Sequence, residues 1–228
     1  MYELRANVVV YVYVNFDEMP MSVSGSMTGG KTMEVRGTRA VFASVDPNWD
    51  RRNSSFIPVL CVVKRALGWE AVTRPCLVLL RRDAKRSWVL TPPKGWLVAE
   101  SASGVVTTTF VVNTILGFVS AAVKSTTTGA PVLIMDSASG HISLAARDAA
   151  KRLFHLAVSP GGITQFSQPV DCGYAHLLRT MYGELYYAWV AGRGEGHLKG
   201  QDAAQQMLSW LGLAHLATCA KISAGVCA

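Results

Sequence analysis

Cysteine is scarce in this chain, and its arrangement excludes two common kinds of small scaffold. The 228 residues contain five cysteines, and no two of them form a Cys-x-x-Cys pair. A disulfide framework uses an even number of cysteines, and a structural zinc site needs paired Cys or His ligands. The chain also begins without the charged stretch, apolar core and cleavage site of a secretory signal. We therefore expect neither disulfides nor structural zinc, in a reducing, intracellular setting.

Charged residues are also few. They make up 16% of the chain against 50% hydrophobic residues, which gives ample material for a buried core and differs from the composition of disordered chains. The length suits one compact core. Lys and Arg outnumber Asp and Glu by 22 to 15, so the net charge is +7. This balance favours a polyanionic partner such as nucleic acid, although many basic proteins have no such partner.

Several motifs of other enzyme classes are missing. The sequence contains no Gly-x-Ser-x-Gly elbow, so a serine hydrolase is not expected. Gly161-Gly162 is not followed by Lys-Ser/Thr, and so it does not resemble a nucleotide phosphate loop. We expect no small-molecule cofactor.

Residues 101–123 contain no charge and are long enough to cross a bilayer. Their Ser, Thr, Asn and Gly content lowers the hydropathy, and no basic cluster precedes them as an anchor would. We therefore expect a helix buried against a sheet and no membrane partner.

Apolar runs and turn residues predict a mixed α/β fold. Residues 8–14 (VVVYVYV) are β-branched and aromatic without a break, which is typical of a central strand covered on both faces. Further strands are expected at 32–42, 56–63, 76–80, 131–135 and 154–158, with turns at 19–30 and 64–74. Helices are expected from about 101 to 128, from Ser143, with Leu144, Ala149 and Leu153 on one face, and after Asp171. The order predicts a mixed central sheet flanked by helices in residues 1–192, followed by a helical tail at 193–228.

Three aspartates stand at the ends of these elements. Asp17 and Asp136 each follow an apolar strand, and Asp171 lies between a proline-containing loop and a helix start. Three such carboxylates could meet at one edge of a sheet and bind Mg²⁺, which prefers oxygen ligands. Taken singly, each aspartate also fits a turn former, and Asp171 fits a helix N-cap.

The stretches around the aspartates are more specific than their spacing. They read NFDEMP at 15–20, LIMDSASGH at 133–141 and QPVD at 168–171, and 35 positions separate Asp136 from Asp171. These stretches resemble the catalytic blocks of the Tc1/mariner and pogo (Tigger, jerky) group of DDE transposases. The Gly95-Trp96 pair, followed by residues 101–104 and Phe110, is similar to the segment that precedes the second block in pogo-like proteins. The resemblance covers roughly residues 7–190.

This resemblance implies an RNase H-like fold, Mg²⁺ or Mn²⁺ as cofactor, DNA as substrate and a nuclear location. It also implies nicking and strand transfer by direct attack on a phosphodiester. Carried over by position, Asp17, Asp136 and Asp171 become the catalytic metal ligands. Glu18 is then a neighbouring charge, and His141 orients Asp136, contacts the phosphate or is a structural histidine.

Three departures from the family pattern bear on activity. Ser137 replaces the usual Asn after the second aspartate, and Met19 replaces the usual Thr after Asp-Glu. Members of the group carry N-terminal helix-turn-helix modules, whereas here the first catalytic strand begins close to Met1. Two alternatives therefore stay open: a non-catalytic remnant that binds nucleic acid or protein, and a nuclease acting on RNA-containing duplexes. The sequence is compatible with a monomer and with a homodimer.

Basic residues gather beside one predicted strand. Arg81, Arg82, Lys85 and Arg86 lie near Trp88, and smaller basic pairs occur at 51–52 and 64–65. Contacts to DNA phosphates and a solvated loop surface are both compatible with each cluster.

Overall fold

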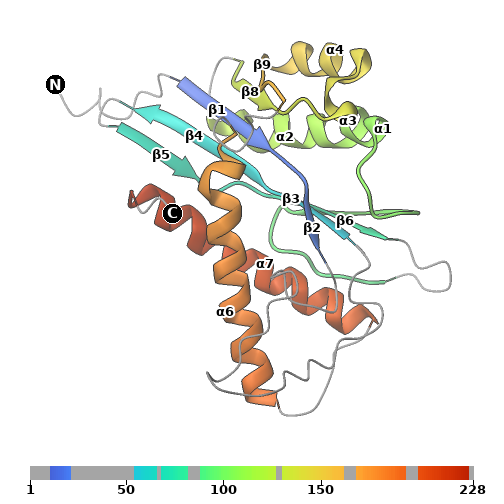
Figure 1. Cartoon of the computed structure of the whole chain (residues 1–228), viewed down its shortest axis with the longest axis vertical. Coiled ribbons are helices and arrows are strands. Elements are labelled where there is room, and N and C mark those ends of the chain that lie inside the picture. The colour runs from blue at the N-terminus through green and yellow to red at the C-terminus, as the bar shows by residue number, and fades with distance from the viewer. Residues whose placement is uncertain are drawn as a thin grey trace.

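The computed structural model describes residues 11–21, 54–65, 68–81, 88–126, 130–161, 168–193 and 200–225. Two mixed sheets form its centre, one with strand order β5-β4-β1-β8-β9 and one with order β2-β3-β6-β7 (Figure 1). The strands are β1 Tyr11–Phe16, β2 Met19–Met21, β3 Ser54–Ile57, β4 Val59–Arg65, β5 Gly68–Val72, β6 Leu77–Arg81, β7 Leu97–Ser101, β8 Val132–Met135 and β9 His155–Val158. The helical elements are α1 Thr108–Phe110, η2 Val111–Ile115, α2 Leu116–Val123, η3 Lys124–Thr126, α3 Ser139–Ile142, α4 Leu144–Leu153, η4 Val170–Tyr174, α6 Ala175–Arg193 and α7 Gly200–Ser223.

Strand β1 occupies the middle of the five-stranded sheet, as the sequence predicts. It pairs antiparallel with β4 and parallel with β8. Its side chains alternate between the two faces, and Val12, Val14 and Phe16 are all buried in one of the two hydrophobic cores. The predicted α/β class, with a mixed sheet flanked by helices, is confirmed.

The two sheets join where β1 ends. Strand β2 follows β1 after only Asp17 and Glu18, and β3 precedes β4 with only Pro58 between them. The pairing continues across this junction, from Phe16 opposite Val59 to Met19 opposite Phe56. Proline cannot donate to the ladder, so it marks a natural break between two sheets. Asp17 therefore lies at the junction and not at a free sheet edge.

Three short strands differ from the prediction. Strand β2 occupies the start of the expected turn at 19–30, β5 lies within the expected turn at 64–74, and β7 falls where a helix was expected to begin. Strands β2 and β7 pair with strands that are distant in sequence, which local patterns do not reveal. Strand β5 pairs antiparallel with β4, the strand that precedes it in the chain. The expected strand at 32–42 lies outside the described residues.

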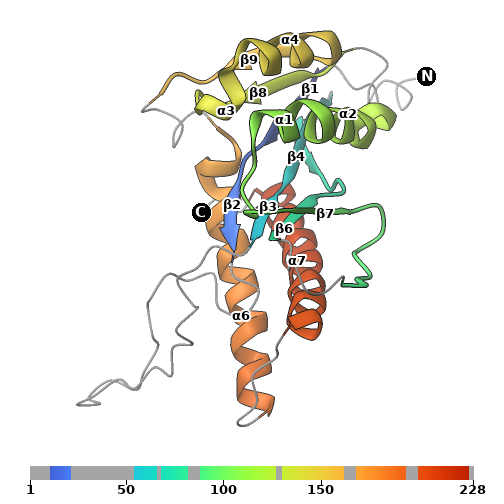
Figure 2. The ribbon, with the colours of Figure 1, turned by 90° about the vertical axis from the view of Figure 1, so that its right-hand side faces the viewer.

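Two helical layers enclose the sheets (Figure 2). On one side, the stretch Thr108–Thr126 packs on the five-stranded sheet together with α4. By length and composition alone, this stretch is also the one among the described residues that could cross a membrane. Ser143 caps α4 as predicted, its hydroxyl accepting a bond from the Ala146 amide. The predicted face of α4 is wrong for Leu144 and Leu153, which are exposed, whereas Ala149 packs against the core beside the buried Ala146 and Ala150.

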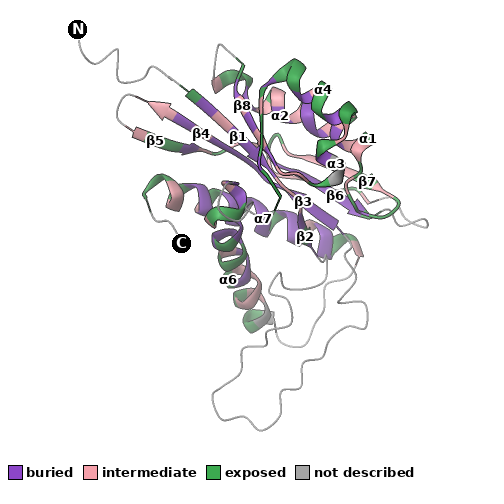
Figure 3. Cartoon of the chain, turned by 45° about the horizontal axis from the view of Figure 1, so that its top comes forward, coloured by how far each residue is buried: buried purple, intermediate pink, exposed green. Residues whose placement is uncertain are grey.

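On the opposite side, α6 and α7 form the second core (Figure 3). The helix expected after Asp171 is confirmed, and Tyr174, Leu178 and Tyr182 recur at helical spacing and are buried. Helix α7, which falls in the expected tail at 193–228, adds Met207, Leu208 and Leu211 to this core.

Gly212 of α7 approaches the loop before β7 so closely that alanine does not fit. A Cβ atom at this position would lie 2.8 Å from Cγ of Pro93. Glycine to alanine in a helix normally stabilises by about 0.5–1 kcal/mol. Here the ring must shift, and overpacking of this kind costs about 1–3 kcal/mol. We expect Gly212→Ala to lower the melting temperature in a thermal unfolding experiment.

The matched control is Gly117→Ala in α2. Among the described residues, no atom lies within 4 Å of a Cβ built at Gly117. This variant should melt at or above the temperature of the unsubstituted chain. Equal stabilisation by both substitutions would contradict the prediction, because it would show that the Pro93 ring can move aside without a loss of folding free energy.

Candidate active site

The three predicted aspartates are carried by neighbouring elements. Asp17 follows β1 directly, and Asp136 follows β8, the parallel neighbour of β1. Carboxyl ends of adjacent parallel strands lie at the same end of a sheet, which places the two side chains near each other. Asp171 lies in η4, the single π-turn that precedes α6. Figure 1 shows the start of α6 beside these strands.

Asp17 experiences the charges of both other aspartates. Burial raises the pKa of its carboxyl to about 6, a hydrogen bond from the Glu18 amide opposes this, and Asp171 and Asp136 raise it further. That hydrogen bond has an N···O distance of 2.7 Å. Asp17 thus lies close enough to Asp171 and to Asp136 to be affected by both charges, and such a concentration of negative charge favours a cation.

His141 of α3 lies beside Asp136. Its side chain is 4% exposed, and Nδ1 forms a short hydrogen bond with Oδ1 of Asp136. Nε2 lies 3.9 Å from Oε1 of Glu18, and the ring meets Phe16 edge-on with centroids 5.5 Å apart. Glu18 and His141, both selected from the sequence, therefore lie next to the aspartates.

The ionisation of this pair follows from its surroundings. Burial alone would lower the pKa of His141, but the bond to Asp136 and the charges of Asp136, Glu18 and Asp17 raise it above its ordinary value. Burial works to raise the pKa of Asp136, but the bond and charge of His141 lower it overall. The acidic neighbours therefore favour the protonated form of His141, and in that form the ring partly neutralises their charge.

Asp171 does not behave as a helix cap in the described part of the chain. It lies inside η4, which starts after Pro169 and has no side-chain cap among the described residues. Gly173 has a φ of 149° and interrupts the helical geometry between Asp171 and Ala175. π-Turns of this kind frequently occur at functional sites.

Ser137, the third neighbouring residue selected from the sequence, contacts the chain after β9. A Cβ atom added to Gly161 would lie 3.1 Å from the Ser137 hydroxyl oxygen. The side chain therefore lies against this loop, next to Asp136.

The carboxylates suit a hard divalent cation in type, since Mg²⁺ and Mn²⁺ take oxygen ligands. Within the described ranges, however, no group of three or more His, Cys, Asp or Glu residues is compact enough to hold a metal ion. Two buried side-chain groups, Nε2 of His141 and the side-chain amide of Gln168, also lack hydrogen-bond partners among these residues. The donor set fits, and the carboxylates must draw together to form a compact site.

The predicted basic cluster is described only in part. Arg81 is exposed at the end of β6. Arg82, Lys85 and Arg86 lie outside the described residues, as does the pair at 51–52. Of the pair at 64–65, Arg65 bonds Glu70 with an N···O distance of 2.6 Å and Lys64 lies over the Trp69 ring.

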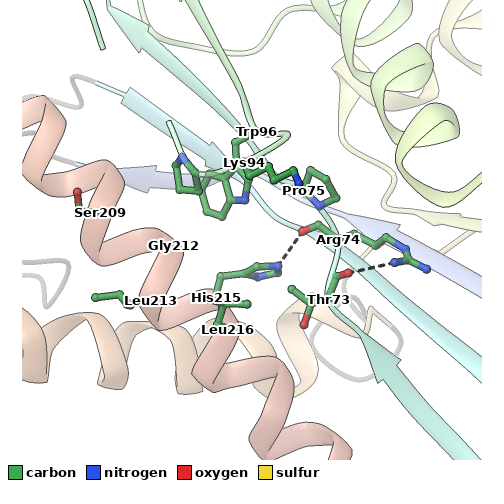
Figure 4. A pocket seen from close by; sticks show the side chains of 11 residues that line it. Thr73, Arg74, Pro75, Lys94, Trp96, Ser209, Gly212, Leu213, His215 and Leu216 are labelled. Atoms are coloured by element: carbon green, nitrogen blue, oxygen red, sulfur yellow. Dashed lines mark hydrogen bonds between the residues drawn. The ribbon is translucent and has the colours of Figure 1, made fainter. Parts of the chain in front are cut away.

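A cavity of about 440 Å³ lies elsewhere in the fold, between α7 and the segments before β6 and β7 (Figure 4). Its floor includes His215, whose ring bonds the Tyr174 hydroxyl at 2.6 Å and the Arg74 carbonyl at 2.9 Å. Burial lowers the pKa of His215 to about 4, so the ring is neutral at physiological pH. None of the predicted site residues lines this cavity. No sequence motif marks His215, which lies in an Ala/Leu-rich segment.

Comparison with known proteins gave matches among solved structures. The Mos1 transposase paired-end complex with the left transposon end has a TM-score of 0.41 and 12% identity, covering 92% of this chain and 55% of that chain. The Mos1 strand transfer complex has a TM-score of 0.39 and 10% identity, with 99% and 55% covered. The Mos1 mariner paired-end complex with Mn has a TM-score of 0.40 and 13% identity, with 92% and 55% covered. The chain thus spans about half the length of the transposase chains it matches. No protein-family model and no curated protein matched.

Proposed function

We propose that this chain is the catalytic core of a transposon-derived DDE-type DNA endonuclease or transposase. The observation that carries the proposal is the position of Asp17 and Asp136 directly after two adjacent parallel strands, with Asp171 close enough to affect the charge of Asp17. The three sequence blocks around them resemble those of the Tc1/mariner and pogo group, and this resemblance is the reason for choosing DNA as substrate. In this proposal residues 1–192 hold the catalytic machinery, and residues 193–228 support it through α7.

In the proposed reaction, Asp17, Asp136 and Asp171 hold Mg²⁺ or Mn²⁺. Such ions supply activation of a water or a DNA 3′ hydroxyl and stabilisation of the leaving oxygen in an in-line displacement. His141 holds the carboxylate of Asp136 through Nδ1 and thereby fixes its direction. Glu18 adds negative charge beside His141 and, together with Asp136, favours the cationic form of the ring. Arg81 and the neighbouring basic residues Arg82, Lys85 and Arg86 are proposed to contact DNA phosphates.

The proposal is tested by nicking of supercoiled plasmid DNA with purified chain. We expect nicking in the presence of Mn²⁺, none in EDTA, and loss of the activity in Asp136→Asn. The control is Asp148→Asn, because Asp148 is an exposed acid on α4. Equal activity in Asp136→Asn and the unsubstituted chain would exclude Asp136 as a catalytic group. An RNA/DNA hybrid tested in parallel separates a DNA endonuclease from a nuclease of RNA-containing duplexes.

A second candidate is a non-catalytic module that binds nucleic acid or protein through the same fold. It is favoured by the lack of a compact ligand group among the described residues. The net charge of +7 would then serve phosphate binding alone. This candidate predicts salt-sensitive retention of DNA in a gel-shift experiment, with no nicking at any Mn²⁺ concentration.

A further inference from the structure

One buried amide connects the three segments that carry the aspartates. Asn15 is 1% exposed and lies on β1, two residues before Asp17. Its Nδ2 donates to the carbonyl of Ile134, at 2.9 Å, and its Oδ1 accepts from the amide of Val170, at 2.8 Å. Ile134 lies two residues before Asp136, and Val170 lies one residue before Asp171. The same side chain therefore bonds the backbone beside both other aspartates.

These bonds differ from ordinary sheet bonds. The link to Ile134 crosses 119 positions of the chain, and the link to Val170 crosses 155. Strand pairing already fixes β1 beside β8, with Asn15 opposite Ile134. Among the described residues, η4 belongs to neither sheet. The bond from Val170 therefore fixes the start of the segment that carries Asp171 directly to the catalytic strand.

The chemistry of the side chain is specific to an amide. Asparagine offers a donor and an acceptor on one short, planar group, and here each faces a backbone partner of the opposite kind. Leucine has a similar size but satisfies neither partner, and burial makes an unmade hydrogen bond costly. Ionised aspartate accepts from Val170 but cannot donate to Ile134. The three residue types therefore separate the two bonds experimentally.

We propose that Asn15 is a positioning residue that holds Asp136 and Asp171 in place relative to Asp17. This role rests on the proposed function, since the positioned carboxylates are its metal ligands. It also extends that function, because it assigns to the Asn of the first block a task at the two other blocks.

The test measures two quantities in the full chain. The first is hydrogen exchange of the Val170 amide without metal, followed by NMR. The second is Mn²⁺ affinity, measured by calorimetry with the metal alone. For Asn15→Leu we expect Val170 exchange at least tenfold faster and Mn²⁺ binding at least tenfold weaker. In Asn15→Asp the Val170 amide should remain protected.

The matched control is Gln205→Leu. The Gln205 side chain, on α7, likewise forms two hydrogen bonds with the backbone. It accepts from the Thr91 amide at 2.8 Å and donates to the Thr91 carbonyl at 2.9 Å. Its loss should leave both the Val170 exchange and the Mn²⁺ affinity unchanged. If Asn15→Leu does not fold, Asn15→Ser replaces it, since the shorter hydroxyl cannot span both bonds.

The outcomes separate the two proposals. Mn²⁺ affinity within twofold of the unsubstituted chain in a folded Asn15→Leu variant overturns the positioning role while leaving the proposed function intact. An unsubstituted chain that neither binds Mn²⁺ nor nicks DNA overturns the proposed function. In that case the exchange rate of the Val170 amide alone tests whether Asn15 positions the segments. Faster exchange in Asn15→Leu supports this role, and unchanged exchange overturns it.

Discussion

Replacing Asp17 with asparagine is expected to make the metal-free chain more stable at pH 7.5 and to remove its nicking activity. Burial and the charges of Asp171 and Asp136 raise the pKa of Asp17 from 3.8 to about 6. The native chain therefore binds this proton more tightly than the unfolded chain does. Stability is lost as the pH rises from about 4 through 6, and asparagine avoids that loss because it is never ionised.

The size of the stability gain follows from the same shift. One unit of difference in pKa corresponds to about 1.4 kcal/mol in the free energy of unfolding. Because the carboxyl is only partly buried, solvent screening reduces the expected gain in this free energy to roughly 2 kcal/mol. For a chain of this length that is a rise in melting temperature of about 4–8 °C. Asparagine can still accept the bond from the Glu18 amide, so the local turn is kept. The gain should be present in EDTA at pH 7.5 and absent near pH 4.

Activity should change in the opposite direction. A metal ion that stabilises the charge of the transition state contributes several kcal/mol. Losing about 4 kcal/mol of this corresponds to roughly a thousandfold slower nicking. The control is again Asp148→Asn, which should change neither quantity measurably. A less stable Asp17→Asn chain at pH 7.5, or one that nicks normally, would contradict the assignment of Asp17.

Mn²⁺ affinity is expected to rise steeply with pH. Asp17, with a pKa of about 6, must lose its proton to bind a metal. His141 has a pKa above its ordinary value and repels the incoming cation while it is protonated. Each proton released on binding changes the affinity about tenfold per pH unit below the pKa of its group. Calorimetry between pH 5.5 and 8 should therefore show tightening by one to two orders of magnitude.

The variant that separates the two groups is His141→Gln. It removes the cation but keeps a group able to hydrogen-bond Asp136, so the pH dependence should become shallower and reflect Asp17. His155→Gln is the control, since His155 is exposed on β9. If Mn²⁺ affinity does not depend on pH in the unsubstituted chain, neither group participates in binding.

The parts of the fold that could be predicted are those whose signals are local. Apolar runs predicted β1, β8 and β9, and a serine before a helical pattern predicted the N-terminus of α4. Strands β2 and β7 could not be found this way because pairing with distant segments stabilises them. Strand β5 was missed for another reason: Gly68 suggests a turn, although the segment pairs with the preceding strand β4. The face of α4 was wrong because small alanines, and not Leu144, fit against the helical layer.

The candidate site shows the same division. The positions of Asp17 and Asp136 at strand ends were predictable because each follows an apolar run, and Asp171 was placed by the proline-containing segment before it. Their mutual influence, and the bond between His141 and Asp136, depend on the folding of distant segments. Asn15 stood within a motif, but its two partners are 119 and 155 positions away, so its role was visible only in the folded chain.

The short π-turn that carries Asp171 limits how the chain length can vary here. Each helical residue turns the chain by about 100°, so one residue more or fewer between Val170 and Ala175 would point the carboxylate in a different direction. Gly173, within the same turn, has a positive φ that glycine adopts more readily than other residues. Insertions and deletions should therefore be tolerated poorly in this five-residue stretch, while surface loops elsewhere can differ in length at little cost.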